Sequence, residues 1–114
     1  GLKTMISDLV VSMPDGNITM QALKRFFKTP SYKKADVVIP FSSTYKYCGA
    51  AFSGDAYVLG APEFVLREDY DKFKVLIENY SSDGYRVLVF GRYSGVPDGK
   101  ELTEAVTPLG LRNL

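Results

Sequence analysis

The chain has 114 residues, which suits one compact domain, and its formal net charge of +1 gives no electrostatic footprint for nucleic acid or an anionic membrane surface. It contains no histidine and a single cysteine, so histidine-dependent nucleophilic catalysis, a zinc site of histidine and cysteine, and an internal disulfide are excluded. No apolar run approaches the roughly 20 residues that cross a bilayer.

The first quarter of the chain predicts two helices. Apolar residues recur at spacings of three and four across residues 2–13, which is typical of one stripe of an amphipathic helix. Pro14-Asp15-Gly16 would end this helix, and Asn17 or Thr19 would cap a second helix whose apolar residues continue to Phe27. Two such helices form an αα-hairpin that needs another surface to cover its apolar stripe.

The central segments change from helical to strand character. Residues 36–41 are short and rich in β-branched side chains, which predicts a strand. Residues 45–52 and 56–59 flank the turn residues Ser53-Gly54-Asp55, and this arrangement predicts a β-hairpin.

The second half of the chain changes from helical patterns to strand patterns once more. Pro62 favours the first position of a short helix, and the periodic apolar residues of 70–80 predict another helix that Asp83-Gly84 would end. Residues 85–90 and 105–111 predict two further strands, although a proline inside the second is unusual. The order αα-βββ-αα-ββ indicates an α+β domain with a largely antiparallel β-sheet flanked by helices on at least one face.

Candidate site residues lie where the strands end. Gly60-Ala61 leaves a bare stretch of backbone between a strand and a helix, and Phe41 is followed five residues later by Lys46. Arg86 is a second cation in an otherwise apolar strand. An aromatic ring and cations beside open backbone suit a flat heteroaromatic ring that carries phosphate.

Each of these residues also has a commoner structural role. Phe41 would pack in the core, Lys46 would be a solvated surface lysine, and Gly60 would serve a turn. Arg86 would form an ion pair of small energetic worth at the end of the strand. Composition and spacing alone therefore leave a ligand pocket as the less common interpretation.

Three segments taken together carry more information than any of these residues. PFSSTYK (residues 40–46), LGAPE (59–63) and GYRVL (84–88) occur in this order, after an earlier NITMQAL (17–23). The set resembles the nucleotide-binding (N) domain of bacterial P-type (E1-E2) cation-transporting ATPases, over a span from about Ile18 to Val89. Each segment alone is a weak signal, whereas the ordered set is fairly specific.

The resemblance implies an ATP site. Phe41 matches the phenylalanine that stacks on adenine, and Lys46 matches the lysine that lines the pocket. Gly60 and Ala61 match the small residues against which the ring slides, and Arg86 matches the arginine that reaches the phosphates. The implied ATP-binding residues are Phe41, Ser43, Lys46, Gly60, Ala61 and Arg86.

The sequence departs from the family pattern at three positions. Leu59 stands where the motif most often has lysine, Met20 where animal calcium pumps have a glutamate that meets the adenine amino group, and Ser43 where those pumps have an arginine. A pocket with fewer charges should bind ATP weakly and mainly through stacking.

The resemblance also implies the chain's place in a larger enzyme. Residues 1–114 would be a single nucleotide-binding domain excised from a membrane pump, at the cytoplasmic face of the cell membrane and without membrane contact of its own. The domain would bind the adenosine part of ATP, as Mg-ATP in the parent enzyme, and present the phosphates to the phosphorylation domain of the same parent chain. That parent, an ATP-driven translocase for calcium or another divalent cation, hydrolyses ATP through an aspartyl-phosphate.

No DKTGT segment, which carries the phosphorylated aspartate of the family, occurs in the sequence. We therefore expect no catalytic residue in this chain. We also expect no metal ligand and, because the net charge is only +1, no nucleic-acid partner.

Two other functions are open. A non-enzymatic α+β interaction module would use the same residues for packing and predicts a fully buried Phe41. A small stand-alone hydrolase is disfavoured by the missing histidine and by the lack of a close pair of acids.

Overall fold

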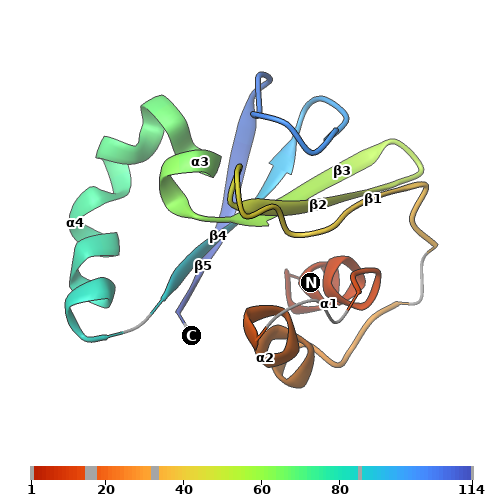
Figure 1. The fold of residues 1–114 in the computed structure, drawn as a ribbon, viewed down its shortest axis with the longest axis horizontal. Coiled ribbons are helices and arrows are strands. Elements are labelled where there is room, and N and C mark those ends of the chain that lie inside the picture. Colours follow the sequence, from red (N-terminus) through yellow and green to blue (C-terminus); the bar gives the residue numbers. More distant parts are fainter. Residues whose placement is uncertain (1, 15–17, 32–33, 85, 114) are drawn as a thin grey trace.

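The computed structural model describes residues 2–14, 18–31, 34–84 and 86–113, and it confirms the predicted α+β class and the order of elements (Figure 1). The helices are α1 (Leu2–Val11), α2 (Ile18–Phe26), α3 (Pro62–Leu66), a 3-10 turn η1 (Arg67–Asp69) and α4 (Tyr70–Ser82). The strands are β1 (Val37–Ile39), β2 (Tyr47–Phe52), β3 (Asp55–Gly60), β4 (Val87–Tyr93) and β5 (Val106–Asn113). In the described part of the chain no helix is long and apolar enough to cross a membrane.

The strands form one sheet in the order β1-β2-β3-β4-β5, with every neighbouring pair antiparallel. The β2–β3 hairpin closes at the pair Phe52–Asp55. Its two loop residues, Ser53 and Gly54, have φ of 51° and 92°. Positive φ at both positions matches the twist of the flanking strands, which suits the glycine, while the N–H of Ser53 donates a hydrogen bond to the Asp36 carboxylate at 2.7 Å.

Helices cover both faces of the sheet, α1 and α2 on one and α3 and α4 on the other (Figure 1). Alternate residues of β2 divide between the two layers, because successive side chains of a strand point to opposite faces. Cys48 and Ala50 join the core cluster of α1 and α2, whereas Tyr47 and Ala51 join the cluster of α3 and α4. All six residues of β2 are therefore buried.

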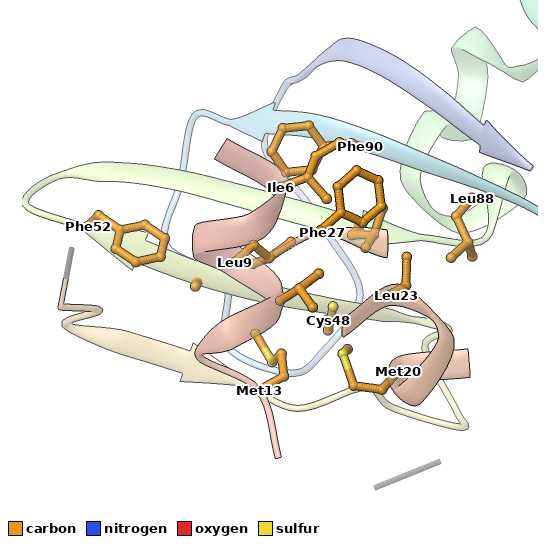
Figure 2. Close-up of a cluster of buried hydrophobic side chains, with 13 residues drawn as sticks. Ile6, Leu9, Met13, Met20, Leu23, Phe27, Cys48, Phe52, Leu88 and Phe90 are labelled. Atoms are coloured by element: carbon orange, nitrogen blue, oxygen red, sulfur yellow. The ribbon is translucent and has the colours of Figure 1, made fainter. Parts of the chain in front are cut away.

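The α1–α2 layer is held by an apolar cluster (Figure 2). Leu9 of α1 and Leu23 of α2 are buried in it with Phe90 of β4. On the sheet, the ring of Phe90 lies against Tyr57 with ring centroids 5.6 Å apart and nearly parallel planes. The apolar residues spaced three and four apart in the first helix thus face the sheet, as the sequence pattern predicts.

A polar contact fixes the segment that leads from α2 towards β1. Asp8 of α1 is buried, and its carboxylate accepts hydrogen bonds from both the backbone N–H and the hydroxyl of Ser31, each at 2.7 Å. The neighbouring Ser7 hydroxyl accepts the N–H of Thr29 at 3.3 Å. These contacts satisfy a buried carboxylate that would otherwise be costly.

Several predicted boundaries shift. The first helix ends at Val11 instead of Met13, and β4 continues past Phe90 to Tyr93. Pro108 is accommodated because β5 is an edge strand and because the β4–β5 register is irregular between Phe90 and Gly91, opposite Pro108.

The expectations about where helices and strands begin and end have different outcomes. Thr19 is the second residue of α2 and not its cap, so that alternative is wrong. The Asp15-Gly16 turn, the Asn17 cap and the strand position of Tyr85 lie outside the described residues.

Burial of Cys48 should make the folded protein less stable at alkaline pH. Burial raises the pKa of its thiol from 9.0 to about 12. The unfolded thiol therefore ionises at a lower pH than the folded one, so the contribution of Cys48 to stability is intact below about pH 9 and is lost progressively as the pH rises to about 12. We expect the free energy of unfolding to fall by about 1 kcal/mol more in the wild type than in Cys48→Ala between pH 8 and pH 10.

Chemical denaturation of both proteins at the two pH values measures this difference. Burial also raises the pKa of Tyr47, but Tyr47 is present in both proteins and cancels in the comparison. Parallel loss of stability in wild type and variant would contradict the expectation.

Candidate functional site

The loop before β2 is a compact turn built around Ser42. The Ser42 hydroxyl accepts hydrogen bonds from the N–H groups of Thr44 at 3.2 Å and Tyr45 at 3.0 Å. The Ser42 carbonyl accepts the N–H of Lys46 at 2.8 Å, and the Ser42 N–H donates to the carbonyl of Tyr47 at 3.1 Å. This local network fixes the loop on whose two ends Phe41 and Lys46 stand.

Lys46 closes the loop in an unusual backbone conformation. Its φ is 59°, in the left-handed region that residues other than glycine seldom adopt. Its carbonyl accepts the N–H of Ala61 at 2.8 Å, which joins the loop to the start of α3. Strained residues of this kind persist where surrounding contacts hold them, and they cluster at functional sites.

Gly60 allows this close approach. It pairs with Tyr47 at the end of the β2–β3 ladder. A Cβ atom on Gly60 would lie 2.3 Å from the carbonyl oxygen of Lys46 and 2.5 Å from the Cβ of Tyr47. The space beside this glycine is therefore filled by the protein's own loop.

Arg86 lies immediately before β4, not inside the strand, and its side chain is exposed. Its Nη1 donates a hydrogen bond to the hydroxyl of Thr19 at 2.9 Å. This bond links the start of β4 to α2 and holds the guanidinium beside that helix.

One groove opens between α2 and the Phe41–Lys46 loop, and we call it the α2 groove. Its volume is about 750 Å³, within the range of roughly 300–1,000 Å³ typical of ligand pockets. It is lined by Ile18, Thr19, Ala22, Phe41, Ser43, Lys46 and Arg86.

A second groove, the α4 groove, lies between α3, α4 and the start of β4. Its volume is about 470 Å³. Its apolar lining is Pro62, Ile77, Val87 and Leu88, and its polar lining includes Glu63, Tyr70, Glu78 and Ser81. Phe41, Lys46, Ala61 and Arg86 complete it.

The two grooves meet at three shared residues, Phe41, Lys46 and Arg86. Phe41 is half-buried and packs against the edge of the α1–α2 core cluster, while Lys46 and Arg86 are exposed. Side chains from two segments of the sequence, the 41–46 loop and the residue before β4, therefore line both grooves.

The remaining predicted site residues lie around this junction. Ser43 lines the α2 groove and Ala61 lines the α4 groove. Gly60 is buried and lines neither groove. Gly60 contributes to the site indirectly, because its lack of a side chain leaves room for the backbone of Lys46.

Two of the departures from the family pattern lie in the core. Met20 is 3% exposed and Leu59 is 1% exposed, and both belong to the α1–α2 cluster. The side of α2 that faces the groove carries Ile18, Thr19 and Ala22 instead. These three residues were missed, although the spacing of Ile18 and Ala22 by four places them on one helix face.

The residues of α4 were also missed as site residues. Ile77 and Ser81 are four apart and Glu78 adjoins them, so one side of α4 borders the groove. The sequence offered only the helical period as a signal, and that period does not distinguish a groove wall from core packing.

The cations at the junction form no ion pair with an acid in the described part of the chain. Within the described residues the ion pairs are Lys72–Asp69 and Arg92–Asp55, so neither Lys46 nor Arg86 takes part in one. The same part of the chain contains no group of three or more acidic or cysteine side chains arranged to hold a metal ion. The junction can therefore attract an anion without a metal ligand set of its own.

Comparison of the sequence with protein-family models and with curated proteins gives no match. The chemistry of the two grooves and the ordered sequence segments therefore carry the functional assignment.

Proposed function

We propose that this chain is the nucleotide-binding domain of a P-type cation-transporting ATPase. It binds the adenosine part of ATP and presents the phosphates to the phosphorylation domain of the parent chain. The observation that supports this most is the meeting of Phe41, Lys46 and Arg86 at the junction of two grooves. An aromatic face and two cations are the groups that a nucleotide requires.

The half-buried state of Phe41 favours this proposal over a non-enzymatic interaction module, which requires a fully buried ring. A ring with one face against the core and another part open to a groove can stack on a base. The α2 groove has a size suited to part of a nucleotide, and its hydroxyls and cations suit ribose and phosphate.

In this proposal the chain contributes positioning and not bond chemistry. Phe41 holds the base, Lys46 and Arg86 attract the phosphates, and Thr19 holds the Arg86 side chain through its hydroxyl. The Mg²⁺ of Mg-ATP arrives on the phosphates, and the aspartate that accepts the phosphoryl group belongs to the parent's phosphorylation domain. Correct placement of the γ-phosphate is itself a large part of the catalysis of phosphoryl transfer.

An NMR titration with ATP and with adenosine tests the proposal. We expect ATP to bind with about −4 to −6 kcal/mol and to shift the amide signals of Lys46, Ala61 and Arg86. Because both cations are exposed, we expect ATP to bind only about tenfold more tightly than adenosine. The double variant Lys46→Met with Arg86→Met should bind the two ligands about equally.

The matched control is the pair Lys72→Met with Arg92→Met, which removes two exposed cations that line neither groove. This control should retain the preference for ATP. Absence of any signal shift with ATP in the folded wild type would favour the interaction module.

A further inference from the structure

The two grooves that meet at Phe41 differ in charge. Among the described residues, the α4 groove is lined by two carboxylates, Glu63 and Glu78, whereas the α2 groove is lined by none. Both grooves share the two cations and carry hydroxyls, Thr19 and Ser43 in the α2 groove and Tyr70 and Ser81 in the α4 groove, so the carboxylates are what distinguishes them. Phosphate is repelled by carboxylates and attracted by cations and hydroxyl donors, so the two grooves suit opposite ends of a nucleotide.

The α4 groove has the features of a base pocket. Its lining includes Ile77 of α4 and Val87 of β4, two neighbours in the α3–α4 core cluster that offer an apolar surface to a flat ring. Glu78 follows Ile77 directly on α4 and is exposed at the groove. Glu63 also lines a further hollow beside Phe64 and Arg67, which Glu78 does not line.

We propose that the nucleotide lies across Phe41, with its phosphates in the α2 groove and its base in the α4 groove, where Glu78 accepts a hydrogen bond from the exocyclic amino group. This proposal rests on the nucleotide-binding function proposed above. An ionised carboxylate only accepts hydrogen bonds, so Glu78 favours a base that carries an amino group, as adenine does at C6. Glu78 is thus a specificity-determining residue on the opposite side of Phe41 from α2.

The test compares AMP with purine riboside 5′-monophosphate, which has hydrogen in place of the amino group and is otherwise the same. Dissociation constants for both ligands are measured by NMR titration at one ionic strength. We expect the wild type to prefer AMP about tenfold, since a hydrogen bond to a charged group is worth at least this much. Glu78→Ala should bring the ratio close to one, and Glu78→Gln should give an intermediate ratio because an amide oxygen still accepts.

The ratio of the two dissociation constants is the readout, because removal of the Glu78 charge raises the affinity for both phosphate-bearing ligands alike. Glu68→Ala is the matched control: Glu68 is exposed in η1, next to α4, and lines neither groove. It should keep the ratio of the wild type.

A second readout separates the two ends of the ligand. Ribose 5-phosphate should shift the amide signals of Thr19 and Ser43 but leave Ile77 and Ser81 unchanged, whereas AMP should shift all four. Binding of both nucleotides with a ratio that Glu78→Ala does not alter would overturn the base position and leave the proposed function standing. Failure of ATP, AMP and purine riboside monophosphate to bind at all would overturn both proposals.

Discussion

Replacement of Gly60 by alanine is expected to lower the free energy of unfolding by about 3 kcal/mol, at the upper end for an added methyl group in a packed site. The new Cβ would lie 2.3 Å from the carbonyl oxygen of Lys46 and 2.5 to 2.7 Å from the Cβ and Cα of Tyr47. These are backbone or backbone-adjacent atoms, so no side-chain rotation can relieve the contact. Urea denaturation followed by circular dichroism measures the loss.

Gly49→Ala is the matched control. Gly49 also lies in the β2–β3 ladder, opposite Val58, but the nearest atoms to its added Cβ belong to the side chain of Pro97 at 3.1 Å. A shift of a few tenths of an ångström would accommodate the methyl group, so we expect a loss of about 1 kcal/mol. Equal losses in the two variants would show that the Lys46 loop yields easily, contrary to the tight approach described for it.

The outcome also bears on the site. The loop that packs against Gly60 holds Lys46 in its left-handed conformation, and the carbonyl of Lys46 accepts the N–H of Ala61. A displaced loop would move Lys46 away from the junction of the grooves. The same substitution is therefore expected to weaken the response to ATP in whatever fraction remains folded.

The fold could be predicted from the sequence where one local pattern dominated. The helical period across residues 2–13 and the turn residues around Ser53-Gly54 each specify a single local geometry, and the helix and the turn are both confirmed, although the helix ends at Val11. The extension of β4 to Tyr93 was missed because Gly91 and Arg92 interrupt its apolar pattern. In the folded chain Arg92 lies over the Tyr57 ring at 5.9 Å and pairs with Asp55, so tertiary contacts complete the strand.

The site was predictable only in part, because a linear sequence does not specify how a helix is rotated about its axis. Met20 stands at the position where animal calcium pumps have a glutamate that meets the adenine amino group. The apolar spacing of Met20, Leu23 and Phe27 instead turns Met20 into the core, where it is 3% exposed. Thr19, one residue earlier, lies at the groove and holds Arg86.

Gly60 illustrates a second limit. A glycine between a strand and a helix can leave room for a ligand or for another part of the chain, and the sequence does not distinguish the two cases. Only the register of β2 and β3, which sets Tyr47 opposite Gly60, decides that the protein's own backbone fills the space.

Phe41→Ala is expected to weaken ATP binding by roughly tenfold to a hundredfold, since stacking of a base on an aromatic side chain contributes about 1–3 kcal/mol. Phe41 is the aromatic side chain shared by the two grooves, whereas Tyr70 lines the α4 groove alone, so Phe41 is the ring placed to stack on a ligand that spans both. The dissociation constant from NMR titration measures the effect. Phe26→Ala is the control, because Phe26 is 70% exposed on α2 and lines neither groove.

Truncation of Phe41 also removes contacts with the core cluster, so a loss of binding in the alanine variant alone could reflect an altered fold. Phe41→Leu separates the two causes. Leucine keeps most of the apolar contact but has no aromatic face, and a change of this kind typically costs less than about 1.5 kcal/mol of stability. If stacking anchors the base, Phe41→Leu should stay folded and bind ATP nearly as weakly as Phe41→Ala. Binding at the wild-type level in the leucine variant would mean that Phe41 serves only as an apolar wall, and the base would then have to be held by the cations and the α4 groove.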